Sequence, residues 1–388
     1  MSGQILPTRK FECTSCKTSD YRMSTQEVGS IAPNACFKCG GPMKIIDDTP
    51  PEWLRNVQKV VGGELDVDDF LAFEDKVEFE VAPSSGSLQK VMKNLKKMGY
   101  ISAARGTSFA SKLLVMKSPV YPREKVWPNL LLFCITFLSV LAAGYFLLFE
   151  SLTFALMFAI SLMLMLSSHE LGHMISAWKN GIDVTPPYFI PFPSALGTMG
   201  AIVSVRSPPP TKDALVEMGA AGPLAGFLIA IPLALIGLSL STPSSSGVVP
   251  PASPLIFSIF QYAVLGQLTT PIIIHPLAFA GWVVFLLTFF NLLPAGQLDG
   301  GHVARGFLGM ERHHQLTKWV GFLMLFSGLF FVSYPFWFWG FLILLAFRDY
   351  HSGALDEVST LSRRGRLIAL ASWIVFILCL PLPTGGEF

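Results

Sequence analysis

The chain has 388 residues, of which 52% are hydrophobic and only 14% are charged, and its mean hydropathy is positive. This composition excludes an ordinary soluble protein and is typical of a membrane protein. The formal net charge of +2 is too small to indicate a nucleic-acid or acidic partner. Charged residues concentrate in residues 1–125, and apolar stretches of about 20 residues follow one another from Trp127 onward. We therefore predict three parts: a zinc-ribbon-like domain (1–48), a small soluble domain (49–120) and a transmembrane domain (121–388).

The N-terminal segment carries four of the six cysteines in two pairs. Cys13 and Cys16 form one pair, Cys36 and Cys39 form the other, and nineteen residues separate the pairs. The segment lacks the apolar core of a cleavable signal, so we expect it in the reducing cytosol, where disulfides are not expected. The spacing predicts a zinc ribbon whose four thiolates hold one structural zinc, with a rubredoxin-like iron site or a redox pair as alternatives. Because its surroundings are only mildly basic, we expect a cytosolic protein partner for it and consider nucleic acid unsupported.

The second part has the pattern of a small α+β domain. Apolar and acidic residues alternate over 77–81, which predicts a strand, and apolar residues then recur at helical spacing from Ser87 to Gly99. Two further strands are predicted at 100–103 and 112–116, which completes a β-α-β-β unit.

The third part contains about seven apolar stretches that could span a bilayer. They are predicted at 128–149, 152–176, 214–240, 276–296, 316–332, 335–347 and 367–382. From a cytosolic N-terminus, Lys and Arg fall in the inner loops and are absent from the outer ones, which is the bias that orients membrane proteins. We expect a multi-pass plasma-membrane protein with its C-terminus outside. The stretch from 316 to 347 could instead be one bent span with an interfacial piece.

Residues 181–210 are apolar but are broken by prolines and glycines, so they do not fit a helix. We predict two strands near 187–192 and 198–206. Non-helical backbone at membrane depth must be buried in protein or line a wet cavity, so a cavity is expected beside this hairpin. The expected fold is a mainly α polytopic membrane protein of about six to seven transmembrane helices with a membrane-embedded β-hairpin, plus the ribbon and the α+β domain.

The sequence HELGH follows a run of apolar residues in the second predicted span. His169 and His173 are one helical turn apart on the same face, so both imidazoles could bind one metal, and Glu170 lies beside them. This pattern predicts a zinc metalloprotease, in which an open zinc site activates water and the glutamate accepts its proton. A chance histidine cluster at the membrane interface is the alternative, but ionisable residues inside an apolar helix are costly unless they are used.

A zinc site of this kind needs a third ligand from the membrane part. The candidates are Asp183, Asp213, Glu217 and Asp299. His169 lies near the cytosolic end of its helix, at roughly 25 Å from the start. Asp299 follows another span that runs in the same direction, so the two should meet at similar depth. The alternative is that the glycines around Asp299 simply form a cytosolic turn.

The HELGH motif together with NLLPAGQLDGG resembles the site-2 protease family of intramembrane zinc metalloproteases. The resemblance covers roughly 118–382 and implies that His169, His173 and Asp299 bind zinc. It further implies that Glu170 is the general base and that Asn291 is a polar contact near the substrate or the oxyanion. The stretches between the motifs resemble the branch found in archaea, cyanobacteria and plastids. No inserted PDZ module or following CBS pair is apparent.

Two functions of different class follow from these patterns. The first is an intramembrane endopeptidase that acts on the transmembrane segments of other membrane proteins in the bilayer. The second is a non-catalytic membrane-protein binder or chaperone, or a zinc carrier. A non-catalytic relative would tend to lose Glu170 or a ligand, and a carrier would need ionisable residues through several spans. The glycines in GAAGPLAG predict close helix packing, with a part in the active-site floor as the alternative.

Overall fold

The computed structural model describes residues 6–32, 35–82, 85–106, 111–119, 122, 125–248, 252–266, 272–330, 336–346 and 351–383. The chain divides into two compact units. The N-terminal unit comprises Met1–Pro122 and Leu355–Thr360, and the helical unit comprises Arg123–Ala354 and Leu361–Phe388. The predicted boundary near residue 48 falls within the first unit, and the division into three domains stays a prediction.

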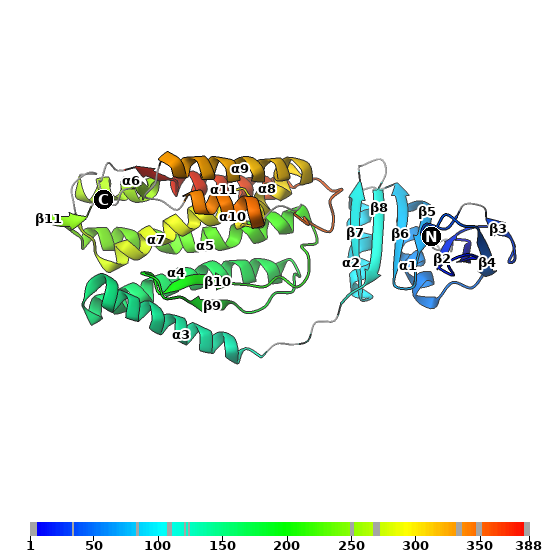
Figure 1. The fold of residues 1–388 in the computed structure, drawn as a ribbon, viewed down its shortest axis with the longest axis horizontal. Coiled ribbons are helices and arrows are strands. Elements are labelled where there is room, and N and C mark those ends of the chain that lie inside the picture. The colour runs from blue at the N-terminus through cyan, green and yellow to red at the C-terminus, as the bar shows by residue number, and fades with distance from the viewer. Residues whose placement is uncertain are drawn as a thin grey trace. The chain divides into compact units, whose positions relative to one another are not determined.

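The N-terminal unit is built on one antiparallel sheet. Among the residues that the structure describes, eight strands join in the order β3-β4-β1-β2-β5-β6-β8-β7 (Figure 1). The strands are β1 (Thr8–Cys13), β2 (Ser19–Met23), β3 (Ile31–Ala32), β4 (Met43–Asp47), β5 (Asp66–Ala72), β6 (Lys76–Ala82), β7 (Tyr100–Gly106) and β8 (Ser111–Lys117). The ribbon-like and α+β segments thus share a sheet, joined where β2 pairs with β5.

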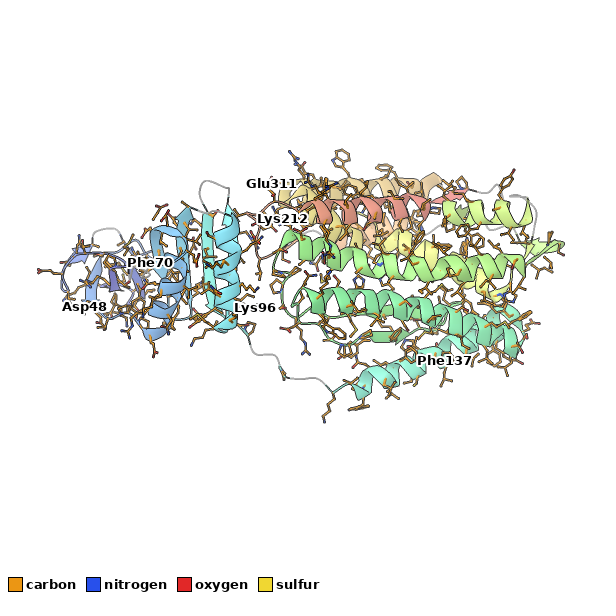
Figure 2. The ribbon with its side chains drawn as sticks, turned by 180° about the vertical axis from the view of Figure 1, so that it is seen from behind. Asp48, Phe70, Lys96, Phe137, Lys212 and Glu311 are labelled. Carbon is orange, nitrogen blue, oxygen red and sulfur yellow. The ribbon has the colours of Figure 1, made fainter. Side chains whose placement is uncertain are left out.

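Two helices cover this sheet with apolar faces. They are α1 (Glu52–Gly62) and α2 (Ser85–Lys97), and their buried leucines and valines recur at helical spacing. Phe70 of β5 lies in the same core (Figure 2). The predicted β-α-β-β unit is present as β6, α2, β7 and β8. Ala104 of β7 also pairs with the distant segment Leu355–Thr360, since its N–H donates to Leu355 O (2.8 Å).

The helical unit consists mainly of apolar helices, as a membrane protein requires. They are α3 (Trp127–Ala143), its π-helical continuation η1 (Gly144–Phe149), α4 (Leu152–Lys179), α5 (Lys212–Ser239), α6 (Leu255–Leu265), α7 (Pro276–Asn291), α8 (Asp299–Leu308), α9 (Met310–Phe330), α10 (Phe336–Ala346) and α11 (Arg363–Leu378). Within the described ranges, three helical segments are long and apolar enough to cross a membrane: Trp127–Phe149, Leu152–Lys179 and Lys212–Ser239. Figure 2 labels Phe137 on the first and Lys212 at the start of the third.

The remaining predicted spans correspond to shorter helices. Helix α7 has 16 residues, or about 24 Å, which is less than the hydrocarbon thickness of about 30 Å. Its predicted range of 276–296 was too long because the chain leaves the helix after Asn291. The junction between the predicted spans 316–332 and 335–347 lies outside the described residues. Helix α6 was not predicted, because its apolar run is too short to read as a span. The total of about seven spans stays a prediction.

The predicted hairpin is present as β9 (Tyr188–Pro191) and β10 (Thr198–Ile202), which pair antiparallel. The second strand ends at Ile202 and not at 206, and an isolated bridge between Val184 and Val205 continues the pairing. Asn129 of α3 fixes the approach to β9 by donating to Pro186 O (3.0 Å) and Pro187 O (3.2 Å). Short pairs outside the hairpin are formed by β11 (Thr242–Val248) with β13 (Ile272–Ile273) and by β12 (Ala252–Pro254) with β14 (Pro381–Pro383).

Candidate metal centre

Helix α4 presents the two histidines of HELGH to each other. The Nε2 atoms of His169 and His173 lie 3.1 Å apart, with ring centroids at 4.8 Å. The Nδ1 atom of His173 lies 2.8 Å from Met218 O, and a proton donated there leaves Nε2 free for a metal. The spacing of four residues on a continuous helix is sufficient to create this half of the site.

Asp299 supplies the third group from the first turn of α8. Its Oδ2 lies 3.4 Å from His169 Nε2, and its Oδ1 lies 3.4 Å from His173 Nε2. Ligands at about 2.0–2.1 Å from a tetrahedral zinc are separated by roughly 3.3 Å. The three separations therefore fit one zinc ion with an open fourth position. In the described part of the chain, this set and the cysteine set are the two groups with metal-binding geometry.

The turn between α7 and α8 brings Asp299 to this point. Gly296 adopts a positive φ of 54°, which favours glycine. A Cβ on Gly300 would overlap Leu292 O, so the turn closes only with glycine there. The glycines around Asp299 therefore do form a turn, as the alternative interpretation predicted. The tight turn also positions the carboxylate of Asp299.

The other three candidates for third ligand have different partners or positions. Glu217 contacts Arg364 Nε (3.3 Å) and Lys179 Nζ (3.9 Å). Asp213 accepts hydrogen bonds from the Ser362 side chain and backbone. Asp183 lies in the loop after α4, where its backbone N–H donates to Ser207 Oγ (2.8 Å). None of the three joins the His169–His173 group.

The glycines of GAAGPLAG lie directly against the candidate ligands. A Cβ on Gly222 would overlap the His173 ring, and one on Gly226 would lie 3.3 Å from His169 Cβ. A Cβ on Gly219 would likewise overlap the Asp299 backbone oxygen and His302 Cβ. These glycines provide the predicted close helix packing, and this packing brings α5 directly against the candidate ligands.

A cavity of about 450 Å³ opens onto the three candidate ligands. Glu170, only 7% exposed, lines it beside Asn291 and Gln297. One wall consists of Ala201–Val203, which includes the end of β10. Glu170 and the end of an extended strand therefore both border the space next to the three candidate ligands.

One residue that lines the cavity, and its hydrogen-bond partner, were not selected from the sequence. His302 lines the cavity, and its Nδ1 lies 2.8 Å from Nε2 of His351. His302 follows Asp299 by three residues on the same helix, and this spacing could have placed it near the site. No local pattern indicates that His351, 49 residues away in the sequence, is its partner.

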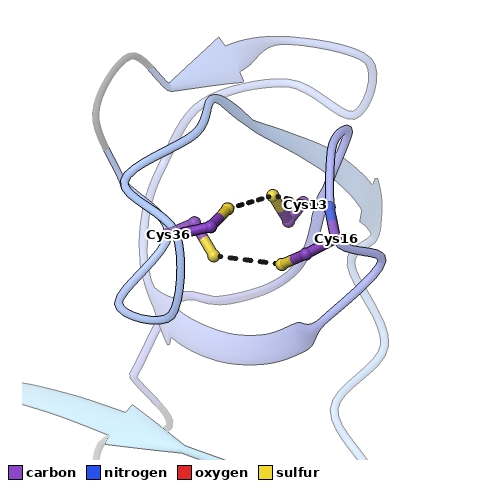
Figure 3. A group of neighbouring side chains, drawn as sticks. Cys13, Cys16 and Cys36 are labelled. Atoms are coloured by element: carbon purple, nitrogen blue, oxygen red, sulfur yellow. Dashed lines mark hydrogen bonds between the residues drawn. The ribbon is translucent and has the colours of Figure 1, made fainter.

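The four paired cysteines form the second group, at one end of the N-terminal sheet. Sγ of Cys13 lies 3.5 Å from that of Cys39, and Sγ of Cys16 lies 3.5 Å from that of Cys36 (Figure 3). Sulfurs at about 2.3 Å from a tetrahedral zinc would be separated by roughly 3.8 Å. All four are free thiols in close contact. The geometry is compatible with a zinc ribbon.

The pKa values of the cysteines in this cluster are shifted in opposite directions. Hydrogen bonds from the Thr18 hydroxyl and amide lower the pKa of the Cys16 thiol to about 6. The Gly41 amide lowers the pKa of Cys39, but the three neighbouring cysteines outweigh it and raise that pKa to about 12. Because metal ligands must be thiolates, metal binding releases protons from such a cluster and strengthens as the pH rises.

The comparisons with known proteins agree with the geometry of the helical unit. Residues 157–334 match the model "Peptidase family M50". The chain is 32% identical over 237 residues to "Probable zinc metalloprotease EGY2, chloroplastic" of Arabidopsis thaliana, covering 58% of this chain and 42% of the relative. It is 33% identical over 230 residues to "Probable zinc metalloprotease EGY1, chloroplastic" of Oryza sativa subsp. japonica, covering 55% and 38%.

The chain therefore spans about two fifths of the length of these relatives, with 42% and 38% covered. No solved structure matches it significantly. The matched residues 157–334 include both motifs and all three candidate ligands of the helical unit. Residues 157–334 thus form a domain of peptidase family M50, the site-2 protease family, and the chain is a homologue of the EGY proteins of plastids.

Proposed function

We propose that this chain is a zinc metalloendopeptidase that hydrolyses peptide bonds in or near the transmembrane segments of other proteins. One observation carries the proposal. His169, His173 and Asp299 have the separations of three zinc ligands, and a buried glutamate shares their cavity. The names of the EGY relatives support zinc as the metal.

The residues of the cavity divide the chemistry between them. A zinc ion held by His169, His173 and Asp299 would supply Lewis acidity for the substrate carbonyl and for the attacking water. Glu170 lies next to His169 on α4, accepts the proton of that water and passes it to the leaving nitrogen. Asn291 offers an amide that hydrogen-bonds the substrate backbone within the same cavity.

The strand β10 is suited to hold the substrate. A helical substrate hides its carbonyl groups in its own hydrogen bonds, so it must be extended before it is cut. Ala201–Val203 border the cavity beside the candidate ligands, and Ile202 is an exposed residue there. Pairing between the main chain of this strand and the substrate captures an extended peptide regardless of its side chains.

The experiment is a cleavage assay on purified, zinc-loaded protein with a panel of single-span substrates. Glu170→Gln is compared with Glu311→Gln, a matched change in the first turn of α9 outside the cavity. We expect the first variant to keep its zinc and lose cleavage, and the second to cleave like the parent. A chelator should abolish cleavage by the parent.

The alternatives make different predictions in the same assay. A parent protein that binds the substrates without cutting them would be a binder or chaperone. A parent protein that transports zinc across vesicle membranes without cutting the substrates would be a carrier. Near-parental cleavage by Glu170→Gln would also remove the role of this glutamate as the general base.

We propose further that the cysteine cluster holds a structural zinc and that the N-terminal unit binds a protein partner. The sulfur separations support the metal, while the partner is inferred only from the weakly basic sequence. For orientation, we propose a cytosolic N-terminus on the strength of the Lys and Arg distribution. The EGY relatives are named as chloroplastic, and a plasma-membrane location has no support from them.

A further inference from the structure

A pair of histidines connects the cavity to the loop before α11. His302 lies on α8, three residues after Asp299, and its side chain lines the cavity. Its Nδ1 is 2.8 Å from Nε2 of His351, and the two rings are nearly perpendicular at 89°. His351 is 6% exposed, so the contact is shielded from competing water.

The backbone fixes the direction of hydrogen bonding in this pair. The N–H of Gly353 donates to His351 Nδ1 at 2.9 Å, and the loop reaches this position through a positive φ of 72° at Gly353. A backbone amide can only donate, so Nδ1 of His351 is the acceptor and a neutral ring carries its proton on Nε2. That proton is donated to Nδ1 of His302.

The hydrogen bond from His351 in turn sets the protonation of His302. With Nδ1 occupied as an acceptor, the neutral ring keeps its proton on Nε2. The fully buried Arg305 lies nearby and donates to His351 O (3.4 Å), and this cation disfavours a second positive charge in the pair. Among the described residues, no group is hydrogen-bonded to Nε2 of His302. An oriented donor therefore remains free on a residue of the cavity lining.

We propose that Nε2–H of His302 donates a hydrogen bond to the carbonyl oxygen of the peptide bond being cut. His302 is then a catalytic residue, and His351 is a positioning residue that sets its tautomer. The proposal rests on the peptidase function proposed above. As the carbonyl carbon becomes tetrahedral, its oxygen gains negative charge. A donor already oriented in a cavity of low dielectric stabilises that charge more than it stabilises the starting amide.

The tautomer is tested first, by ¹⁵N NMR of histidine-labelled protein in nanodiscs, in the zinc-free and zinc-loaded forms. His302→Gln and His351→Gln identify the two signals by their loss. We expect His302 of the parent protein to show a single Nε2–H tautomer. In His351→Gln, its signal should change to a mixture of the two tautomers. A parent His302 protonated on Nδ1, or already mixed, would overturn the proposal without any activity measurement.

Kinetics then test the role of the donor. His302→Phe should lower kcat by about 10²- to 10³-fold with little change in KM and an unchanged zinc content. His302→Gln, whose amide can donate, should recover part of that loss, and His351→Gln should fall between it and the parent. His314→Gln changes a histidine of α9 that is not part of the cavity lining and should leave kcat unchanged.

The outcomes separate the two claims. If the parent cleaves and a folded, zinc-loaded His302→Phe variant keeps its kcat, the donor role of His302 is wrong while the peptidase function stands. Loss of zinc or of folded protein in both His302 variants would make the residue structural and would equally overturn its role as a donor. If the parent itself does not cleave any substrate, the proposed function fails and the donor role fails with it.

Discussion

Replacing Gly222 by alanine should specifically damage the metal site of the helical unit. Gly222 lies on α5, and its missing side chain leaves room for the His173 ring of α4. A methyl group there would lie well inside 3.0 Å of His173 Nε2, the atom assigned to the metal. Alanine is otherwise favourable in a helix, so the expected loss comes from this overlap alone.

The size of the effect follows from the clearances. Carbon contacts are comfortable at about 3.5 Å, so the ring must retreat by well over 1 Å. Helices α4 and α5 are in very close contact at this interface, where Gly172 leaves no room for a Cβ beside Ala221 O. Moving the helices apart would give up this close packing. Zinc ligands keep within about 0.2 Å of their ideal distances. Mutation of groups that merely orient a ligand costs about 10- to 100-fold in affinity, so we expect the Kd for zinc to rise at least 100-fold.

Gly226→Ala is the matched control, one turn further along α5. Its Cβ would lie 3.3 Å from His169 Cβ and 3.6 Å from His169 Nδ1, distances that a small adjustment relieves. We expect less than about a 10-fold change in zinc affinity for this variant. The measurement is metal content after equilibration with graded chelators. Parental zinc affinity in a folded Gly222→Ala variant would refute the assignment of His173 Nε2 as a ligand.

Three further changes test the third ligand, the cysteine cluster and the strand β10. Asp299→Asn should weaken zinc in the helical unit and abolish cleavage; if metal and turnover both survive, the third ligand lies elsewhere. Cys36→Ser should unfold the N-terminal segment, since metal binding in such small sites supplies much of the folding free energy. It should also reduce zinc from about two ions per chain to about one, and an unchanged count would exclude the cysteines. Ile202→Pro, which removes a backbone donor from β10, should lower cleavage while zinc is retained, and substrates with helix-breaking residues near the cut should suffer least. Equal harm to pre-extended and stably helical substrates would contradict the role of this strand.

The local parts of the site were readable from the sequence because helical periodicity determines them. His169 and His173 share a face at a spacing of four, so no tertiary information was needed. Asp299 required one further step, the comparison of depth between two spans. The four cysteines are brought together as the spacing of their pairs predicted.

The rest depends on contacts between distant segments, which local patterns do not contain. The glycines of α5 look the same whether they face a neighbouring helix or a ligand, and only the packed structure shows Gly222 beneath His173. Likewise, His351 lies beside His302 although 49 residues separate them in the sequence, and no local pattern indicates this contact. The single sheet through the N-terminal unit follows from the pairing of β2 with β5, and strand partners are not encoded in alternation alone.

The most direct test of the proposed peptidase function is to map the cut. The zinc-loaded protein and its Glu170→Gln variant are reconstituted in liposomes with a single-span substrate, and the masses of both products are measured. We predict two complementary fragments whose junction lies in or near the transmembrane segment of the substrate, made by the parent and absent with Glu170→Gln. Fragments that arise only from the soluble tails of the substrate, or equal fragments from the two proteins, would contradict this function.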